Sequence, residues 1–257
     1  MQSLGILGVG ELSESVVRGL RRSGFKGEIN ISPRNAVRAD TLAREYGCKV
    51  LRDNQAVVDR VDLVLLGVRP EAIDEVATQV RLRPDQALLS LAAGISLEQL
   101  RSAFPQVRCT RLMLSCSAKI NSTMVVICPP DQTSESLFGV LGDVVVLEDE
   151  HSFELATVAA CMNGWFYYLL DDLAQWLSDK GLDTSKARAL VLGNLKDCLT
   201  TAESSPDQSL KSLGQAIATP GTFTAEGLAV LMHQPLSATW GAASEVVLDA
   251  LLTRSRL

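Results

Sequence analysis

Histidine and net positive charge are both scarce in this chain of 257 residues. Its two histidines, His151 and His233, lie far apart in the sequence. A metal centre or a histidine base would therefore have few candidates. The chain carries 24 lysines and arginines against 30 aspartates and glutamates, a formal net charge of -6. This balance argues against the broad basic face that binds nucleic-acid backbones, so we expect neither a metal site nor a nucleic-acid partner.

Cysteine pairs and long apolar runs are missing as well. The six cysteines contain no C-x-x-C pair and no zinc-finger spacing, so neither a zinc site nor a disulfide framework is indicated. No basic segment or cleavage signature marks a signal peptide at the N-terminus. The longest uncharged stretch, residues 155–170, falls short of the roughly 20 apolar residues that a membrane span needs. These absences predict a cytoplasmic protein with no membrane partner.

The first half of the chain alternates short apolar runs with segments of helical pattern. This rhythm is typical of β-α units that build a mostly parallel sheet with right-handed crossovers. The runs predicted as strands are 4–7, 28–31, 61–68, 87–91, 107–110, 123–128 and 144–147. The segments predicted as helices are 11–22, 36–46, 71–80, 97–104 and 132–141. We therefore expect an α/β domain over residues 1–150.

No convincing strand follows residue 147, and the remaining sequence predicts helices. One helix face is marked by apolar residues at steps of three and four, namely Leu155, Val158, Met162, Trp165, Phe166, Leu169, Leu173 and Leu177. Further helices are expected at 184–201, 208–218, 225–232 and 238–253, the first of them capped by Asp183 or Thr184. These patterns predict an all-α domain over residues 151–257.

The helical half is too apolar to bury all of its surface if its helices are few and long. We expect a homodimer or a higher homo-oligomer, and the alternative is a monomer with a satisfied core. Within this half, residues 165–168 are four consecutive aromatic residues. A helix spreads such a run around its axis, so we expect most of them in the core or in a subunit interface.

Two glycines follow the first apolar run, in the sequence Gly8-Val9-Gly10-Glu11-Leu12-Ser13. A strand before this G-x-G-x-x-small pattern and a helix after it make the pattern informative. The first glycine permits a tight turn, the second lets the backbone approach a pyrophosphate, and Ser13 is small enough for close helix packing. The backbone at Glu11 and Leu12 then offers N–H groups to the phosphates. We favour a dinucleotide-binding turn over an ordinary glycine turn.

The end of the second predicted strand bears on which dinucleotide is bound. An NAD site places an acidic residue there, but this chain has Ile31-Ser32-Pro33-Arg34-Asn35. Ser32 can donate to a phosphate oxygen, Arg34 can form charge-assisted bonds to it, and Arg38 can assist one turn later. In the alternative interpretation Arg34 is a solvated loop residue and Asn35 is only a helix cap. We favour NADP, bound as NADPH, over NAD.

Two further turns lie at the ends of predicted strands, where ligands of open α/β sheets collect. The first contains Val68, Arg69 and Pro70, and the second contains Ala93 and Gly94. Both turns are expected to border the cofactor, because their small residues leave room for a flat ring. Arg69 is equally explained as a phosphate or ribose contact and as a surface arginine.

Several of these motifs, taken in chain order, resemble the pyrroline-5-carboxylate reductase family. The motifs are Gly8-x-Gly10, Ser32-x-Arg34, Val68-Arg69-Pro70, Ser90-Leu91-Ala92-Ala93-Gly94-Ile95, Arg111-Leu112-Met113, and Thr219-Pro220-Gly221 followed by Thr224 and Gly227-Leu228. The resemblance implies a Rossmann N-terminal domain and a helical C-terminal dimerisation domain that interlocks with its mate. It also implies an active site in the cleft where the domains meet, and reduction of a cyclic imine by NAD(P)H to give proline.

The resemblance also assigns the substrate residues. Thr219, Gly221 and Thr222 are implied to bind the substrate carboxylate through backbone N–H groups and hydroxyls, and Thr224 to hydrogen-bond the imine nitrogen. Three substrate-side motifs nevertheless depart from the family pattern. Met-Pro-Asn-Thr-Pro is replaced by residues 113–117, Gly-Ser-Gly-Pro-Ala-Tyr by residues 160–165, and Thr-Ser-Pro-Gly-Gly-Thr-Thr by residues 218–224.

The last of these changes predicts an altered loop. Thr222 replaces a glycine that tolerates positive φ, a conformation that a β-branched residue resists. Phe223 adds bulk, so we expect a more apolar pocket.

Three hypotheses about function remain open at this point. The first is NADPH-dependent reduction of 1-pyrroline-5-carboxylate to L-proline. The second is the same chemistry on a different imine in specialised metabolism, as the altered motifs suggest. The third is a catalytically inactive nucleotide-binding family member.

Overall fold

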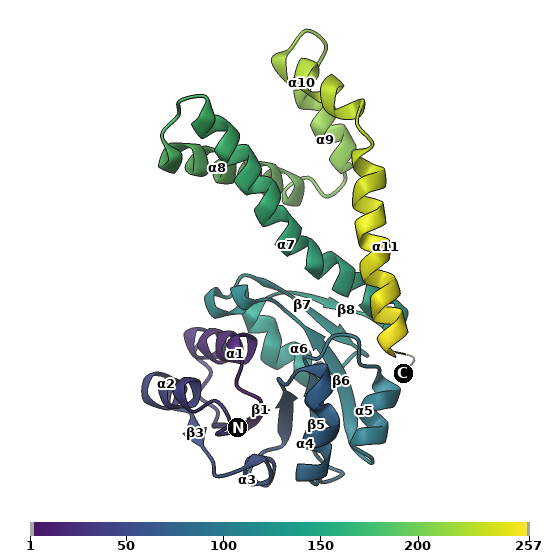
Figure 1. Cartoon of the computed structure of the whole chain (residues 1–257). Coiled ribbons are helices and arrows are strands. Elements are labelled where there is room, and N and C mark those ends of the chain that lie inside the picture. Colours follow the sequence, from purple (N-terminus) through teal and green to yellow (C-terminus); the bar gives the residue numbers. More distant parts are fainter. Residues whose placement is uncertain (1–2, 256–257) are drawn as a thin grey trace. The chain divides into compact units, whose positions relative to one another are not determined.

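The computed structural model describes residues 3–255, and the chain divides into two compact units. The first unit runs up to Ala160 and resumes from Val247, and the second spans Cys161–Val246. The first unit holds the β-sheet, and within the described residues the second contains helices and connecting turns only (Figure 1). Two long helices, α7 (Glu150–Asp179) and α11 (Leu236–Ser255), contribute residues to both units.

Eight strands form a single sheet in the order β3-β2-β1-β4-β5-β6-β7-β8. All neighbours pair in parallel except β6 and β7, which are antiparallel. The strands are β1 (Leu4–Leu7), β2 (Ile29–Ile31), β3 (Lys49–Val50), β4 (Leu63–Leu66), β5 (Ala87–Ser90), β6 (Arg108–Met113), β7 (Thr123–Cys128) and β8 (Gly142–Val146). The predicted fold class, a mostly parallel Rossmann-type sheet followed by helices, is confirmed.

Helices cover both faces of the sheet. One apolar core joins the strands to α1 (Glu11–Arg22), α2 (Ala36–Tyr46) and α6 (Gln132–Phe138). A second core joins them to α3 (Asn54–Val58), α4 (Ile73–Gln79) and α5 (Leu97–Ala103). Side chains alternate between the faces, so Ile6 belongs to the first core and the adjacent Leu7 to the second. Short 3-10 helices η1 (Pro70–Ala72), η2 (Cys116–Ile120) and η3 (Gly139–Leu141) complete the described elements of this unit.

A buried ion cluster fixes the start of α7 on the sheet. Arg111, on β6, is only 1% exposed, and its Nη1 lies 2.7 Å from Glu154 Oε1 and 3.0 Å from Glu150 Oε1. The Phe153 ring lies beneath the guanidinium carbon, with 4.2 Å to the ring centroid. Glu150 Oε1 also accepts the backbone N–H of Leu97 at the start of α5. The cluster therefore connects β6, α5 and α7 within the first unit.

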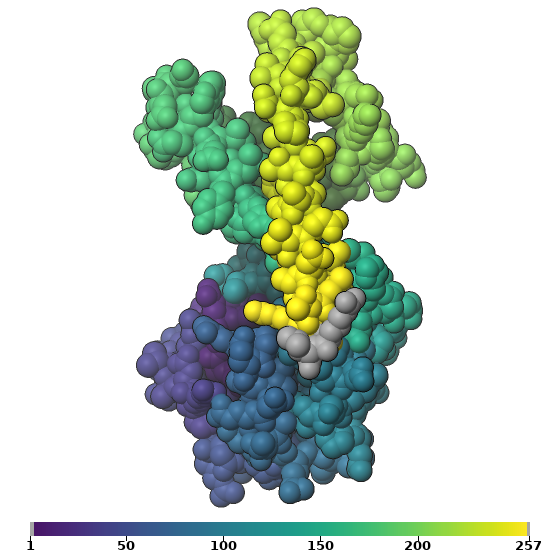
Figure 2. Space-filling view, turned by 45° about the vertical axis from the view of Figure 1, so that its right-hand side comes forward, coloured from purple at the N-terminus to yellow at the C-terminus, as the bar shows by residue number. Residues whose placement is uncertain are grey.

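The last turns of α11 pack on the segment that follows β5, where the yellow helix meets the blue and teal surface in Figure 2. Gly94 has a φ of +70°, and a Cβ added there would lie 3.3 Å from atoms of Arg254 and 3.7 Å from Leu251. Gln99 Nε2 donates to the backbone carbonyl of Arg254 at 3.2 Å. These contacts hold the C-terminal end of α11 on the first unit.

The second unit has hardly any interior of its own. It contains α8 (Thr184–Glu203), α9 (Leu210–Ile217) and α10 (Phe223–Met232) together with parts of α7 and α11. Asp183 caps α8, as predicted, by accepting the backbone N–H groups of Ser185 and Lys186. The hydrogen bond from the Ser185 side chain is the largest cause that lowers the pKa of the Asp183 carboxyl. Among residues 161–246 only Ala187 is buried, so the helices leave large apolar side chains uncovered.

Candidate functional site

The turn after β1 requires a glycine at position 8. Gly8 has a φ of +91°, in the left-handed region. A Cβ at this position would lie 2.5 Å from Val68 Cγ1 and 2.8 Å from the Gly67 carbonyl oxygen. The tight turn predicted at the first glycine of the motif is therefore present and sterically enforced.

Ser13 brings α1 close to the end of β4. Its Oγ donates to the Gly8 carbonyl oxygen at 2.8 Å. A Cβ added to Gly67 would approach Ser13 Oγ to 2.2 Å, so helix and strand are in close contact here. The small residue at the third motif position thus packs as the sequence predicts.

The second glycine of the motif opens onto a cavity. No atom lies within 4 Å of the position that a Cβ of Gly10 would occupy. The adjoining cavity, called here the glycine-turn cavity, measures about 370 Å³. Its lining residues are Gly8, Val9, Gly10, Arg34, Asn35, Gly67, Val68, Arg69 and Ala72. Two arginines and no carboxylate contribute to this lining, and the first turn of α1, at Glu11 and Leu12, has backbone N–H groups without helical acceptors.

Two polar side chains tie the β2–α2 turn to the glycine turn. Ser32 is 1% exposed, and its Oγ accepts the backbone N–H of Gly8 at 3.0 Å. Asn35 Nδ2 donates to the Val9 carbonyl at 3.2 Å, and its Oδ1 accepts the N–H of Arg38 to cap α2. Ser32 therefore supports the turn, and phosphate binding by its hydroxyl stays a prediction.

The two arginines predicted at this edge have different surroundings. Arg34 is exposed over 70% of its side chain, and its Nη1 lies 3.9 Å from Glu75 Oε2. Arg38 is paired with Glu14 of α1, which also lies 2.6 Å from Arg18. The Arg38 guanidinium is thus bound on α1, whereas Arg34 lines the glycine-turn cavity.

A second cavity continues from the first at Gly8, Arg34 and Val68. This cavity, called here the β3-side cavity, measures about 290 Å³. Its other lining residues are Ser32, Pro33, Arg52, Asp53, Asn54, Glu75, Val76 and Gln79. Arg52 and Asn54 were not predicted from the sequence, because the two-residue strand β3 that precedes them was not recognised. Glu75, on α4, was not predicted either.

The two further predicted turns contribute unequally. Val68 lines both cavities, Arg69 lines the glycine-turn cavity, and Pro70 begins η1. Ala93 is exposed, and Gly94 is buried against Leu251 and Arg254. The structure therefore gives Gly94 a packing reason for being glycine, and cofactor contact by the second turn stays a prediction.

The predicted substrate loop forms the start of α10 in the second unit. Gly221 takes the positive φ, +84°, whereas Thr222 has a φ of -97°. Thr222 Oγ1 donates to the Thr219 carbonyl at 2.8 Å and accepts the N–H of Ala225 at 3.2 Å. Thr222 is therefore an unstrained N-cap, and the expectation that this loop differs from the family's stays a prediction. Phe223 is 91% exposed, and Thr224 lies exposed in the first turn of α10.

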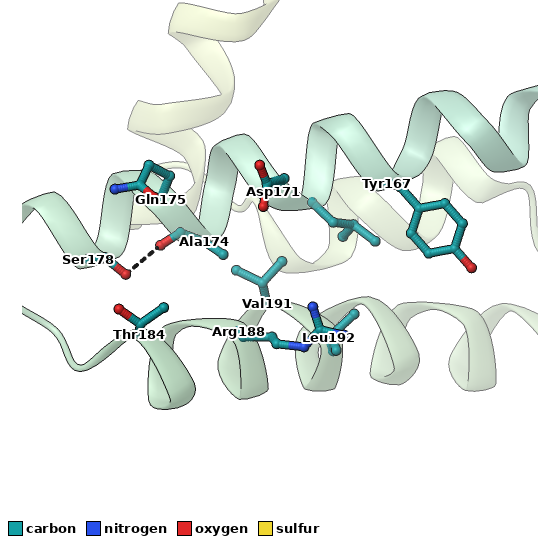
Figure 3. Close-up of a pocket in the computed structure, with 10 residues that line it drawn as sticks. Tyr167, Asp171, Ala174, Gln175, Ser178, Thr184, Arg188, Val191 and Leu192 are labelled. Atoms are coloured by element: carbon teal, nitrogen blue, oxygen red, sulfur yellow. Dashed lines mark hydrogen bonds between the residues drawn. The ribbon is translucent and has the colours of Figure 1, made fainter.

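A third cavity lies between α7 and α8 in the second unit, with a volume of about 180 Å³ (Figure 3). Asp171 and Tyr167 reach it from α7, and Arg188 reaches it from α8. Ser178 Oγ donates to the Ala174 carbonyl within its own helix at 3.1 Å. None of the predicted site residues lines this cavity, so we assign it no catalytic role.

Two absences hold for residues 3–255. No group of three or more histidine, cysteine or acidic side chains there is arranged to hold a metal ion. None of the helices in this range is long and apolar enough to cross a membrane.

Two family models match the chain, one in the part that forms the sheet and one in the helical part that follows it. The model described as "NADP oxidoreductase coenzyme F420-dependent" matches residues 3–94, and "Pyrroline-5-carboxylate reductase dimerisation" matches residues 150–251. A pyrroline-5-carboxylate reductase of Haemophilus influenzae is 26% identical, over 98% of this chain and 96% of that protein. Pyrroline-5-carboxylate reductase 2 of Bacillus subtilis is also 26% identical, over 90% of this chain and 87% of its own.

Solved structures agree with these matches. The 1-pyrroline-5-carboxylate reductase of Streptococcus pyogenes is 25% identical with a TM-score of 0.88, over 100% of this chain and 99% of that one. The Plasmodium falciparum pyrroline carboxylate reductase, solved with NADP bound, shares the fold with a TM-score of 0.86 at 18% identity. The match covers 99% of this chain and 98% of that one. The glycine turn, the doubly covered sheet and the helical unit together define an oxidoreductase of the dinucleotide-binding class. Within that class, the chain is similar over its whole length to pyrroline-5-carboxylate reductases, and it matches the dimerisation model of that family over residues 150–251.

Proposed function

We propose that this protein uses NADPH to reduce a cyclic imine, 1-pyrroline-5-carboxylate, to L-proline. The observation that carries the proposal is the glycine-turn cavity, which has open space at Gly10, two arginines and no carboxylate in its lining. A diphosphate fits such a lining, because backbone N–H groups and guanidinium groups both favour negative charge. Similarity to named relatives adds the reaction, because those relatives are pyrroline-5-carboxylate reductases.

The dinucleotide is held by the residues that the sequence singled out. The backbone from Gly8 to Leu12 binds the diphosphate, and Arg34 binds the 2′-phosphate that distinguishes NADPH from NADH. The absence of an acidic residue from the segment 31–35 supports this choice. Val68, Arg69 and Pro70 border the nicotinamide half, together with Ala93 and Gly94.

The chain's own residues position the substrate and its proton. Bound NADPH supplies the hydride. The backbone N–H of Gly221 and the Thr219 hydroxyl hold the substrate carboxylate at the start of α10, beside Thr222, whose own N–H donates to the Thr219 carbonyl. The Thr224 hydroxyl, in the first turn of the same helix, steers the proton at the imine nitrogen. A protonated imine is already electron-poor at carbon, so no strong acid-base pair is needed.

The working protein is a homo-oligomer of chains divided near residue 150 into a nucleotide-binding domain and a helical domain. The uncovered apolar side chains of the second unit support association, as does the match to a dimerisation model. All six cysteines are free, which supports a reducing compartment such as the cytoplasm.

A direct assay tests the proposal. Purified protein is mixed with NADPH and either 1-pyrroline-5-carboxylate or one of several other cyclic imines, and NADPH oxidation is followed at 340 nm. We expect turnover with 1-pyrroline-5-carboxylate. Tight NADPH binding without turnover of any imine would instead identify a nucleotide-binding protein that has lost catalysis.

A second candidate is reduction of a different imine. It is favoured by Phe223, which stands 91% exposed between the Thr222 cap and Thr224. A large apolar side chain at that point favours a substrate with apolar bulk. Turnover of such an imine, with none of 1-pyrroline-5-carboxylate, would establish this candidate and exclude the first.

A further inference from the structure

The β3-side cavity differs from the glycine-turn cavity in its charge. Four ionic side chains line it: Arg34, Arg52, Asp53 and Glu75. Each arginine has a carboxylate nearby, since Arg34 Nη1 lies 3.9 Å from Glu75 Oε2 and Arg52 Nε lies 3.1 Å from Asp53 Oδ2. The positive charge that could attract a phosphate is therefore largely offset on this side of Arg34.

Glu75 is held in this position by a chain of amide hydrogen bonds. Gln79, one turn later on α4, donates from Nε2 to Glu75 Oε1 at 3.2 Å. Asn54, the first residue of α3, donates from Nδ2 to Gln79 Oε1 at 2.6 Å. One carboxylate oxygen of Glu75 is thus tied to α3 and α4, and the other faces Arg34. Hydrogen bonds from two helices, α3 and α4, therefore fix the position of the Glu75 side chain.

A carboxylate beside Arg34 affects the two nicotinamide cofactors differently. A 2′-phosphate that reaches Arg34 meets the negative charge of Glu75 and competes with it for the guanidinium. A ribose 2′-hydroxyl carries no charge and can donate a hydrogen bond to a carboxylate. Glu75 therefore disfavours the phosphorylated cofactor while it tolerates the other.

We propose that Glu75 is a specificity-determining residue that weakens the preference of this enzyme for NADPH over NADH. This inference rests on the proposed function in one respect, namely that Arg34 binds the 2′-phosphate. The residue that usually decides between NAD and NADP lies at the end of the second strand, here β2. Glu75 lies instead on α4. An acidic residue is thus present at the subsite, supplied from a different element.

The test compares dissociation constants of NADPH and NADH for the full-length protein and its Glu75→Gln variant, measured by fluorescence titration without imine. Gln79 can still hydrogen-bond the glutamine, so only the charge is removed. We expect NADPH to bind about 2- to 5-fold more tightly to the variant, the scale of one exposed ion pair, and NADH to bind no more tightly. The NADPH gain should shrink between about 0.05 M and 0.5 M sodium chloride, because salt screens charges at this exposure.

The matched control is Asp74→Asn, which removes the same charge from the preceding residue of α4. Asp74 is exposed and lines neither cavity, so its replacement should leave both affinities unchanged. The inference is overturned if Glu75→Gln leaves NADPH affinity unchanged, if both cofactors gain equally, or if Asp74→Asn reproduces the effect. Wild-type protein that binds NADH more tightly than NADPH would refute the proposed NADPH preference, while the NADPH gain on Glu75→Gln would still decide the role of Glu75.

Discussion

At the level of single residues, Arg34 is the proposed determinant of cofactor choice. Its side chain is 70% exposed and lines both the glycine-turn cavity and the β3-side cavity, so it is accessible to a phosphate. Arg38 was predicted to assist, but its pairing with Glu14 makes it a structural link between α1 and α2. Arg34 and Arg38 are close in the sequence, but in the fold they lie next to different carboxylates, Glu75 and Glu14.

Replacement of Arg34 by aspartate should weaken NADPH binding about 10- to 100-fold, the range for loss of a hydrogen bond to a charged group. NADH, which lacks the 2′-phosphate, should be affected far less. Titration of both cofactors measures this, and Arg44→Asp, an exposed charge reversal on α2, is the control. Equal affinities of wild type and Arg34→Asp for NADPH would show that another group binds the phosphate.

Thr224 is the residue with the most direct role in the proposed chemistry. Thr224→Ala should lower kcat about 100-fold, within the range for a group that guides a proton in the transition state. Thr224→Ser, which keeps the hydroxyl, should recover most of that loss. Steady-state kinetics of the two variants decide the matter, because equal rates for alanine and serine would leave the hydroxyl without a function.

Cysteine chemistry is also set residue by residue. Burial raises the pKa of the Cys48 thiol to about 11, and burial is likewise the main cause that raises the pKa of Cys128 to about 11. Because both pKa values lie well above 8, both thiols are protonated at pH 8. Only the thiolate form of cysteine reacts readily with alkylating reagents. Iodoacetamide at that pH should leave both unlabelled while the native fold persists, as peptide mass spectrometry can show. Rapid labelling of either cysteine in the native protein would contradict the burial seen here.

At the level of elements, helices and strands are predicted most accurately where the sequence marks their ends clearly. The helices predicted at 11–22 and 36–46 have the bounds of α1 and α2. In α2 the Asn35 side chain caps the start, and Gly47, with a φ of +65°, ends it. By contrast, β3 has two exposed residues and α3 has five residues, too short to show a period.

The missed elements explain the missed site residues. Arg52 and Asn54 flank the boundary between β3 and α3, and without that strand no rule places them at the cofactor edge. Glu75 was missed for another reason, because α4 was recognised but a helix pattern does not show which strand turn its side chains face. Three-dimensional neighbours of this kind, contributed by separate elements, are not encoded in local sequence.

The buried cluster around Arg111 is a polar link between elements of the first unit. Arg111→Ala leaves the carboxylates of Glu150 and Glu154 without their guanidinium, and Glu154 is 2% exposed. Loss of one partner from a buried pair costs about 3–5 kcal/mol, so we expect a loss of that size in the free energy of unfolding. Urea denaturation followed by circular dichroism measures it.

The control for this prediction is Arg83→Ala. Arg83 lies 3.4 Å from Asp85 in an exposed pair, and its Nη2 donates to the Val61 carbonyl at 3.2 Å, contacts that together are worth no more than about 2 kcal/mol. Similar losses for Arg111→Ala and Arg83→Ala would mean that the buried cluster contributes no more than a surface contact.

For the whole molecule, the helical unit is the strongest argument for association. Residues 161–246 bury only Ala187, while Tyr167, Phe223 and Met232 remain exposed. The aromatic run at 165–168 was expected in the core or an interface, and Tyr167 and Tyr168 are uncovered in the single chain. Apolar surface of this extent is stabilised by a second copy.

Sedimentation should therefore give at least twice the 27.7 kDa mass of one chain at micromolar concentration. The helical unit lacks a core of its own, so dilution to monomer should be accompanied by loss of helical circular dichroism. A folded 27.7 kDa species at all concentrations would refute the proposed association.

The central claim, reduction of a cyclic imine by hydride from NADPH, is tested most directly with a labelled cofactor. The protein is incubated with 1-pyrroline-5-carboxylate and NADPH carrying deuterium at the transferable C4 position, and the product is analysed by mass spectrometry and NMR. We predict L-proline with one deuterium at C5, the former imine carbon. Recovery of unreacted imine while NADPH stays bound, or product without the label, would contradict the account.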